Sequence, residues 1–402
     1  MGRVEALVTP SVMRWAREQA NLSIDEAAQE IKRQADEIRA WEDGSVRPSI
    51  AQARKAAEIY RRPLAVFYLP EPPQDFETLR DFRSLPDTVP GTYSRDLALL
   101  IRTTQFRQHW MREYLLNDEM DRLTFVGSAS LSDSPRQIAL DILRVIELTP
   151  TEQKECSSRY EALRLWIHKS EAAGIFIFRQ GQIALEEVRG FVISDDIAPF
   201  VFINSDDSKA GQLFTLAHEL AHLWLNLSGI SNLASYGGPS DRESREIETF
   251  CNKVAAEAVL EDEAFFKEWH TKNTNSPIEE KIQHISGTFK VSEEVVARRL
   301  RDEEIIDQDY YLELREAYQE RWAKHKARER ERLKMSKGGP SYYVTSVAKN
   351  GYAFTQTVVG GFMTGAISGR DASALLNVKV DKFRRLGETA GIPTSAWEGP
   401  RG

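Results

Sequence analysis

The sequence predicts a mainly α-helical, multidomain chain that contains a small α+β core. Apolar residues recur at three- and four-residue spacing along most of its 402 residues, which indicates helices. Three short runs are instead rich in β-branched and aromatic residues and are separated by polar breaks, which predicts a three-stranded sheet. These runs are Ile175–Phe178, Gly190–Ile193 and Pro199–Ile203. We divide the chain into the ranges 1–72, 73–150, 151–305, 306–337 and 338–402.

Composition narrows the functional class. The net charge of −8 (53 basic against 61 acidic residues) argues against a chain that coats nucleic acid through its overall charge. No apolar run reaches the length of a membrane span, and the N-terminus lacks the apolar core of a signal peptide. The two cysteines, Cys156 and Cys251, provide no disulfide framework. The expectation is a soluble cytoplasmic protein.

The most informative segment is a predicted helix at 212–228. His218 and His222 are four residues apart, so their imidazoles share one helical face and can bind one Zn²⁺. Glu219 follows the first histidine and can reach a metal-bound water without being a ligand. This His-Glu-x-x-His spacing is typical of zinc peptidases, and it makes Glu219 the candidate catalytic base.

A second predicted helix, at 241–259, supplies the candidate third ligand. Glu248 suits that role, and Asn252, one turn later, suits a group that orients a histidine. Glu246 is the competing carboxylate. Cys251 has two interpretations, as a small buried apolar residue or as a thiolate that reaches the metal.

The residue that stabilises the oxyanion is left open. Tyr236, His270 and His284 are the candidates, and a packing or surface role is the alternative for each. A sheet edge beside the metal is expected to accept an extended peptide as an added strand.

The N-terminal 72 residues predict a compact helical bundle. Helices are expected over 10–20, from Ser23 to about residue 34, around Trp41 up to Gly44, and over 50–60. Ser23 and Glu26 have the spacing of a capping box. The segments RWAREQANLSIDEAAQEI, IRAWEDGSVRPS and AAEIYRRPLAVFYLP resemble XRE-type helix-turn-helix domains.

That resemblance implies DNA binding through the third helix. Arg33, Arg39 and Arg47 are the candidate phosphate contacts, whereas Asp36 and Glu37 open the third helix and oppose binding. A dimerisation or substrate-docking role for the retained fold is the alternative.

Helices are also predicted at 93–117, 134–148 and 157–173, and two more within 277–303. The stretch 321–337 is basic, with eight Lys/Arg against two Asp/Glu. Residues 368–386 predict a helix, a tight turn at Asn377 and a second helix, which is a plausible second helix-turn-helix. Lys379, Lys382 and Arg385 are its candidate nucleic-acid contacts, and packing or oligomerisation is the alternative.

The segments FVFINSDDSKAGQLFTLAHELAHLWL, EIETFCNKVAAEAVL and FKVSEEVVARRL are similar to the ImmA/IrrE metallo-endopeptidases. The resemblance covers roughly residues 170–305. It implies that His218, His222 and Glu248 bind zinc, that Glu219 is the catalytic base, and that the substrate is a transcriptional repressor or antitoxin. The implied context is stress, mobile-element or phage-defence regulation. The alternative function is a DNA-binding regulator in which the peptidase site is latent or secondary, with duplex or single-stranded DNA as partner and homo-oligomers conceivable.

Overall fold

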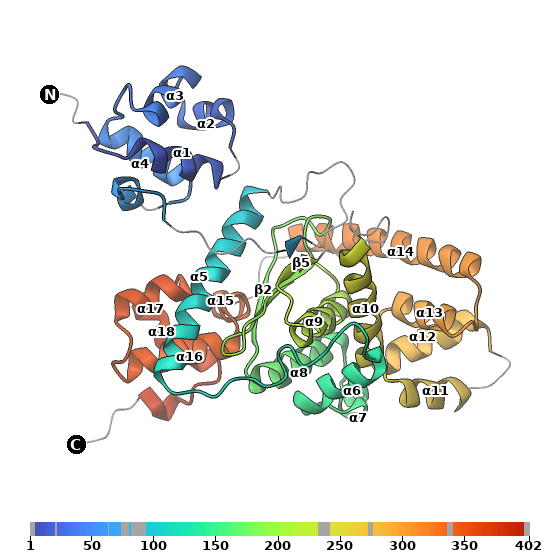
Figure 1. The fold of residues 1–402 in the computed structure, drawn as a ribbon. Helices are drawn as coiled ribbons and strands as arrows, with labels where there is room; N and C mark the ends of the chain where they lie inside the picture. Colours follow the sequence, from blue (N-terminus) through green and yellow to red (C-terminus); the bar gives the residue numbers. More distant parts are fainter. Residues whose placement is uncertain are drawn as a thin grey trace. The chain divides into compact units, whose positions relative to one another are not determined.

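The computed structural model describes residues 5–20, 22–62, 64–73, 80–81, 94–231, 242–271, 276–335 and 341–397. It divides into two compact units, one formed by Met1–Thr78 with Asp87–Arg107 and the other by Leu79–Pro86 with Gln108–Gly402. Figure 1 shows the elements of each unit. None of the described helices is long and apolar enough to cross a bilayer.

The first unit contains the four predicted helices, α1 (Pro10–Glu18), α2 (Ile24–Ile31), α3 (Ala35–Asp43) and α4 (Ile50–Ile59), followed by the 3₁₀ helix η1 (Leu64–Tyr68). The capping box at Ser23 is confirmed, because its side chain accepts from the N–H of Glu26 and the Glu26 side chain returns to the backbone N–H of Ser23. Gly44 ends α3 with φ +83°, as expected for a residue free of a Cβ. A buried ion pair between Arg17 and Glu42 (Nε–Oε1 2.7 Å) joins α1 to α3.

The second unit is built on a mixed sheet of five short strands in the order β1-β5-β3-β4-β2. Their bounds are β1 (Arg80–Asp81), β2 (Phe176–Gln180), β3 (Gly190–Ile193), β4 (Phe200–Asn204) and β5 (Gly229–Ser231). The three predicted strands are confirmed, but the predicted number of strands is wrong. Strands of two and three residues, such as β1 and β5, are too short to show an alternating pattern in the sequence.

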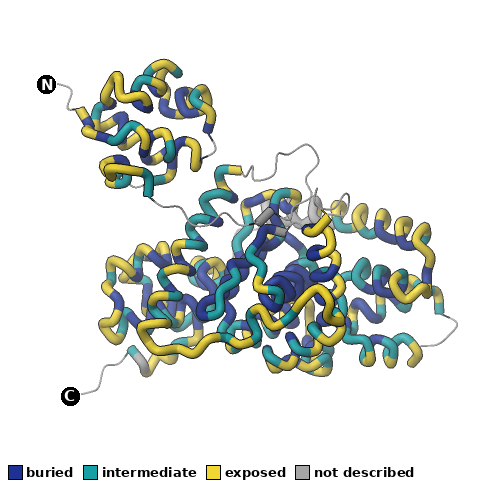
Figure 2. Tube along the Cα trace, in the orientation of Figure 1, coloured by how far each residue is buried: buried dark blue, intermediate teal, exposed yellow. Residues whose placement is uncertain are grey.

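Successive residues of β2, β3 and β4 are buried, so these three strands are covered on both faces (Figure 2). On one face, Val192, Val201 and Ile203 pack in the same core as helix α9 (Lys209–Trp224). On the other face, the rings of Phe178 and Phe200 lie 4.6 Å apart between centroids. Continuous apolar runs are the usual sequence of a strand that is covered on both sides.

The remaining predicted helices of the core are confirmed. They are α5 (Arg95–Asn117), α6 (Pro135–Val145), α8 (Arg159–Ala172), α10 (Arg242–Val259), α12 (Ile278–Phe289) and α13 (Glu293–Asp302). Helix α14 (Gln308–Met335) contains most of the basic stretch 321–337. Two short helices, α7 (Pro150–Glu155) and α11 (Asp262–Thr271), were not predicted. Gln153 of α7 is buried and donates to the carbonyls of Val259 and Phe289 (2.9 and 2.6 Å), so α7 joins the ends of α10 and α12.

The C-terminal module contains α15 (Tyr342–Asn350), α16 (Tyr352–Met363), α17 (Gly369–Leu376), η2 (Val380–Lys382), α18 (Phe383–Thr389) and η3 (Thr394–Trp397). The predicted helix, Asn turn and helix are confirmed, and Asn377 ends α17 with φ +50°. The module packs on the aromatic face of the sheet, where Phe354 of α16 contacts Phe178 and Phe200. Glu171 of α8 accepts from the N–H groups of Tyr352 and Ala353 (2.9 and 3.2 Å) and so caps α16.

The carboxyl group of Glu171 makes the stability of the contact between α8 and α16 depend on pH. Burial raises its pKa, the backbone N–H bonds offset part of that rise, and the pKa settles at about 8. The unfolded chain releases this proton near the ordinary value of 4.5, whereas the folded chain keeps it to about 8. Between these values the folded state binds the extra proton, so the free energy of unfolding falls as pH rises, by at most about 1.4 kcal/mol per pH unit.

Replacing Glu171 with glutamine is therefore expected to stabilise the protein at pH 7.5 by roughly 1–3 kcal/mol, because glutamine keeps an acceptor oxygen without a charge. The measurement is urea unfolding of both proteins at pH 5.5, 6.5 and 7.5. The exposed Glu155→Gln change on α7 is the matched control and should follow the wild type. Equal pH slopes for Glu171→Gln and wild type would show that this carboxyl group does not titrate abnormally.

Candidate metal centre

Helix α9 carries polar side chains that are buried away from solvent. It begins after Ser208, whose side chain accepts from the N–H of Gly211 (2.9 Å), and every residue from Gln212 to Trp224 is buried. The helix packs against β3 and β4 on one side and against α10 on another. Its ionisable side chains therefore need internal partners, because an unpaired charge in such an environment is costly.

Three side chains from α9 and α10 converge. His218 and His222 are completely buried, and Glu248 is 8% exposed. The Nε2 atoms of the two histidines are 3.1 Å apart, and His222 Nε2 lies 3.1 Å from Glu248 Oε1. His218 Nε2 lies 3.4 Å from Glu248 Oε2. These atoms form a group that can hold a metal ion.

The spacing of these atoms fits zinc. Two ligands at 2.0–2.1 Å from a tetrahedral ion lie about 3.3–3.4 Å apart, close to the three separations between these atoms. Burial lowers the pKa of His222, which favours the neutral imidazole that a metal requires. Burial also opposes ionisation of Glu248, but the two imidazoles beside it outweigh that effect and lower the pKa of the Glu248 carboxyl group, so it is ionised. A neutral imidazole and an ionised carboxylate are ordinary zinc ligands.

The structure distinguishes the candidates on α10. Glu248 lies beside the histidines, whereas the competing Glu246 pairs with Arg242 at the surface (2.8 Å). Cys251 is completely buried, and burial, together with Glu248 and Glu219, raises the pKa of its thiol well above the ordinary value. A protonated thiol is a poor metal ligand, so the small apolar role fits Cys251 better. Among the described contacts, none joins Asn252 to either histidine, and its orienting role stays a prediction.

Glu219 lies against the sheet rather than in the ligand group. It is completely buried. A Cβ atom on Gly190 of β3 would lie only 2.6 Å from Glu219 Oε1 and 2.6 Å from Cγ2 of Thr215. The carboxylate therefore sits in space that only glycine leaves open. Sequence reasoning missed Gly190, and its only signal is a glycine at the start of a buried strand.

Changing Gly190 to alanine is expected to displace the Glu219 carboxylate while His218, His222 and Glu248 remain in place. We expect zinc content to stay unchanged and peptidase activity to fall roughly 10–100-fold, because small misplacements of a catalytic group are costly. Zinc content and cleavage rate are the two measurements. Gly287→Ala on α12, where a Cβ would meet nothing within 4 Å, is the matched control. Wild-type activity in Gly190→Ala would show that this close approach is not needed.

The strand next to Glu219 is not an edge strand. β3 pairs with β4 on one side and with β5 on the other, both antiparallel. The expectation that a free sheet edge lies beside the metal is therefore wrong for β3. The short strand β5 follows α9 directly and occupies the position that an added peptide strand would take.

The structure describes two of the three candidates for stabilising the oxyanion. Tyr236 lies outside the described residues. His284 pairs with Glu268 (Nε2–Oε1 2.8 Å), and the ring of His270 stacks on Phe266. Their helices, α11 and α12, lie beyond α10 from α9 in Figure 1, and neither histidine belongs to the ligand group.

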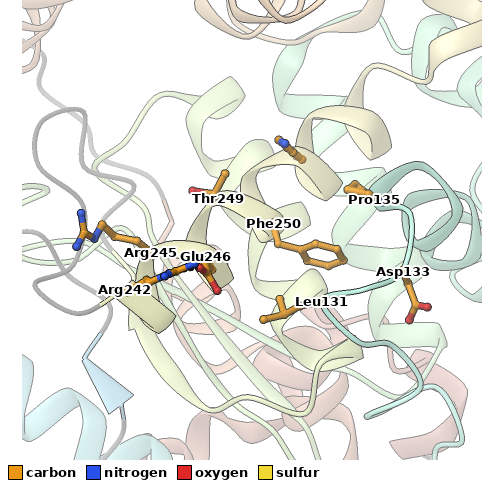
Figure 3. A pocket seen from close by; sticks show the side chains of 9 residues that line it. Leu131, Asp133, Pro135, Arg242, Arg245, Glu246, Thr249 and Phe250 are labelled. Carbon is orange, nitrogen blue, oxygen red and sulfur yellow. Dashed lines mark hydrogen bonds and ion pairs between the residues drawn. The ribbon is translucent and has the colours of Figure 1, made fainter.

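A groove of about 710 Å³ lies on another side of α10. Figure 3 shows Phe250 of α10 facing Leu131, with Asp133 from the segment before α6 and Pro135 at the start of that helix. Its lining includes Glu246 but none of the three ligand residues. Glu246 and Glu248 are two residues apart and so point to different sides of the helix, which keeps this groove separate from the metal group.

The nucleic-acid candidates are surface residues. Arg33, Arg39 and Arg47 are exposed on the first unit, and Arg39 pairs with Asp36 (Nη1–Oδ1 2.6 Å). Lys379 and Arg385 are exposed on the C-terminal module, and Lys382 is partly exposed. DNA binding by either region stays a prediction.

The comparisons agree with the geometry for one part of the chain. Residues 170–301 match the model of the peptidase family described as the IrrE N-terminal-like domain. No curated protein matches the chain. The match supports the ImmA/IrrE peptidase family and indicates a metallopeptidase, and the two histidines with Glu248 make zinc the plausible metal.

Proposed function

We propose that this protein is a zinc-dependent endopeptidase, with His218, His222 and Glu248 as zinc ligands and Glu219 as the catalytic base. The observation that carries the proposal is the convergence of three side chains from α9 and α10, whose nearest nitrogen and oxygen atoms lie 3.1–3.4 Å apart. The ligand residues are buried, and Glu219 lies beside them on α9. The family match over residues 170–301 supports the same reaction class.

The protein residues have distinct chemical tasks. When bound, zinc supplies an activated water and polarises the peptide carbonyl. Glu219 accepts the proton of the attacking water and then passes it to the leaving amine nitrogen, so no net proton is gained or lost by the enzyme. The new C–O bond forms first, and the C–N bond breaks when the protonated amine leaves. Gly190 leaves room for the Glu219 carboxylate between α9 and β3.

The proposed substrate is a protein, namely a cognate transcriptional repressor or antitoxin. The support for this substrate is the resemblance to the ImmA/IrrE peptidases, whereas the family match supports only the metallopeptidase class. Cleavage of such a repressor would release the genes that it silences, in stress, mobile-element or phage-defence regulation.

The experiment is incubation of the purified, zinc-loaded protein with the small repressors or antitoxins encoded next to it, followed by intact-mass analysis. We expect two fragments whose masses sum to the substrate plus one water. Chelation should stop the reaction and added zinc should restore it. Cleavage that persists after complete removal of metal would contradict the proposal.

A further inference from the structure

The C-terminal module carries a surface on which tyrosine rings and cations alternate. We define it as the tyrosine–cation surface, formed by Tyr342 and Tyr343 of α15 with Lys379, Lys382 and Arg385 from the turn and α18. We propose that this surface binds the phosphate backbone of duplex DNA. The inference does not depend on the peptidase activity.

The local fold explains why these cations face outward. Asn377 turns the chain in the left-handed region, and three of the apolar side chains after it point inward. Val378, Phe383 and Leu386 are buried at 5%, 1% and 0% exposure. Lys379, Arg384 and Arg385 therefore lie on the outer side of the turn and of α18, where all three are exposed. A helix, a tight turn and a second helix are the parts of a DNA-binding helix-turn-helix.

The tyrosines hold the cations in place. Lys382 Nζ lies 4.3 Å from the centroid of the Tyr342 ring, and the Arg385 guanidinium lies 5.0 Å from that of Tyr343. The two rings are 5.3 Å apart and nearly perpendicular. Each cation–π contact restricts a long side chain before a ligand arrives, which lowers the entropy lost on binding. The sequence places these tyrosines about 40 residues before the cations, so only the packing of α15 against α18 unites them.

The charge of the module favours a polyanion. Its described residues hold six basic side chains (Lys349, Arg370, Lys379, Lys382, Arg384, Arg385) against three acidic ones (Asp371, Asp381, Glu388), a sum of +3 on a chain of −8. Arg384 is already paired with Glu388 (3.2 Å), so Lys379, Lys382 and Arg385 are the cations that the surface offers to a ligand.

Two further features favour duplex DNA over an acidic protein. Val380 is 42% exposed at the start of η2, which leads into α18. Helix-turn-helix proteins contact base edges near the start of the second helix, and an apolar side chain there suits the thymine methyl group. The phosphates of a duplex also form a regular row that fixed cations can match.

Bound DNA would be held in a defined position relative to the peptidase core. Glu171 caps α16, and Phe354 packs between the aromatic residues of β2 and β4. The module is thus part of the second compact unit. Binding at its surface would place this unit on DNA.

The test uses the full chain and a fluorescently labelled duplex of arbitrary sequence, with binding measured by anisotropy across a salt series. The variant is Lys382→Gln with Arg385→Gln. Removing two phosphate contacts should make the negative slope of log K against log salt shallower by about 1.8 and should weaken binding. The charge-matched control is Arg122→Gln with Arg144→Gln on the core, whose side chains are 70% and 72% exposed. The control should keep the wild-type slope.

Four results would overturn the proposal. They are the absence of duplex binding by the wild type at low salt, equal slopes for variant and control, complete loss of binding in Arg33→Gln with Arg39→Gln, and tighter binding of polyglutamate or of a single strand than of the duplex. Circular dichroism of the variant should match the wild type, because the changes remove surface charges and no buried group.

Discussion

Replacing Glu219 with glutamine is expected to leave one zinc bound per chain and to reduce substrate cleavage by about 10²–10⁴-fold. Glutamine has nearly the same size as glutamate, so the space beside Gly190 stays filled and the ligand group is undisturbed. It cannot accept the proton of the attacking water. Zinc content by elemental analysis and initial cleavage rates on the same preparations are the two measurements.

The control for this change is Glu246→Gln on α10, a glutamate of the same region that pairs with Arg242 and lies outside the ligand group. It should cleave at the wild-type rate. If Glu219→Gln also cleaves at that rate with full zinc content, then Glu219 is not the base and the proposed mechanism is wrong. Loss of zinc in Glu219→Gln would instead show that this carboxylate supports the metal.

Replacing His218 with alanine is expected to abolish both zinc binding and cleavage. The change removes one of the three proposed ligands. It also leaves the buried, ionised Glu248 carboxylate without the imidazole that it contacts. Breaking a buried pair of this kind costs roughly 3–5 kcal/mol of folding free energy. The wild-type protein should gain thermal stability when zinc is added, because a ligand of the folded state alone stabilises it. The variant should gain none.

Zinc stoichiometry and thermal unfolding with and without zinc check this prediction. His109→Ala, at an exposed position on α5, is the matched control and should retain zinc and its stabilisation. Full zinc occupancy in a folded His218→Ala protein would mean that the metal is held elsewhere. Unfolding of the variant alone would not decide the matter, so His218→Asn, which keeps a polar group of similar size, is the second variant.

Much of the metal centre follows from local spacing. A helix of 3.6 residues per turn puts His218 and His222 on one face whatever surrounds it. The same rule makes Glu248 a candidate, but it cannot choose between Glu248 and Glu246, since each could face α9 after a rotation of α10. The apolar stripe of α10 limits that rotation, and the observed packing against α9 and α6 sets it.

The helix and strand periods also predicted most elements of the fold, because apolar repeats are visible over ten or more residues. The strands β1 and β5 escaped prediction since each contains too few residues for a repeat. Their pairing makes β3 an interior strand, which local patterns could not reveal. Backbone pairing depends on which segments meet in space.

The residue pattern alone therefore predicted the histidine pair, the candidate base Glu219 between them and the helical character of the chain, all of which depend on neighbours within one or two turns. The tertiary structure decided which carboxylate lies beside the two histidines, that Gly190 leaves space for Glu219, and that tyrosines and cations about 40 positions apart share one surface. These are contacts between distant segments. Packing of the core sets their distances, and no spacing along the chain contains that information.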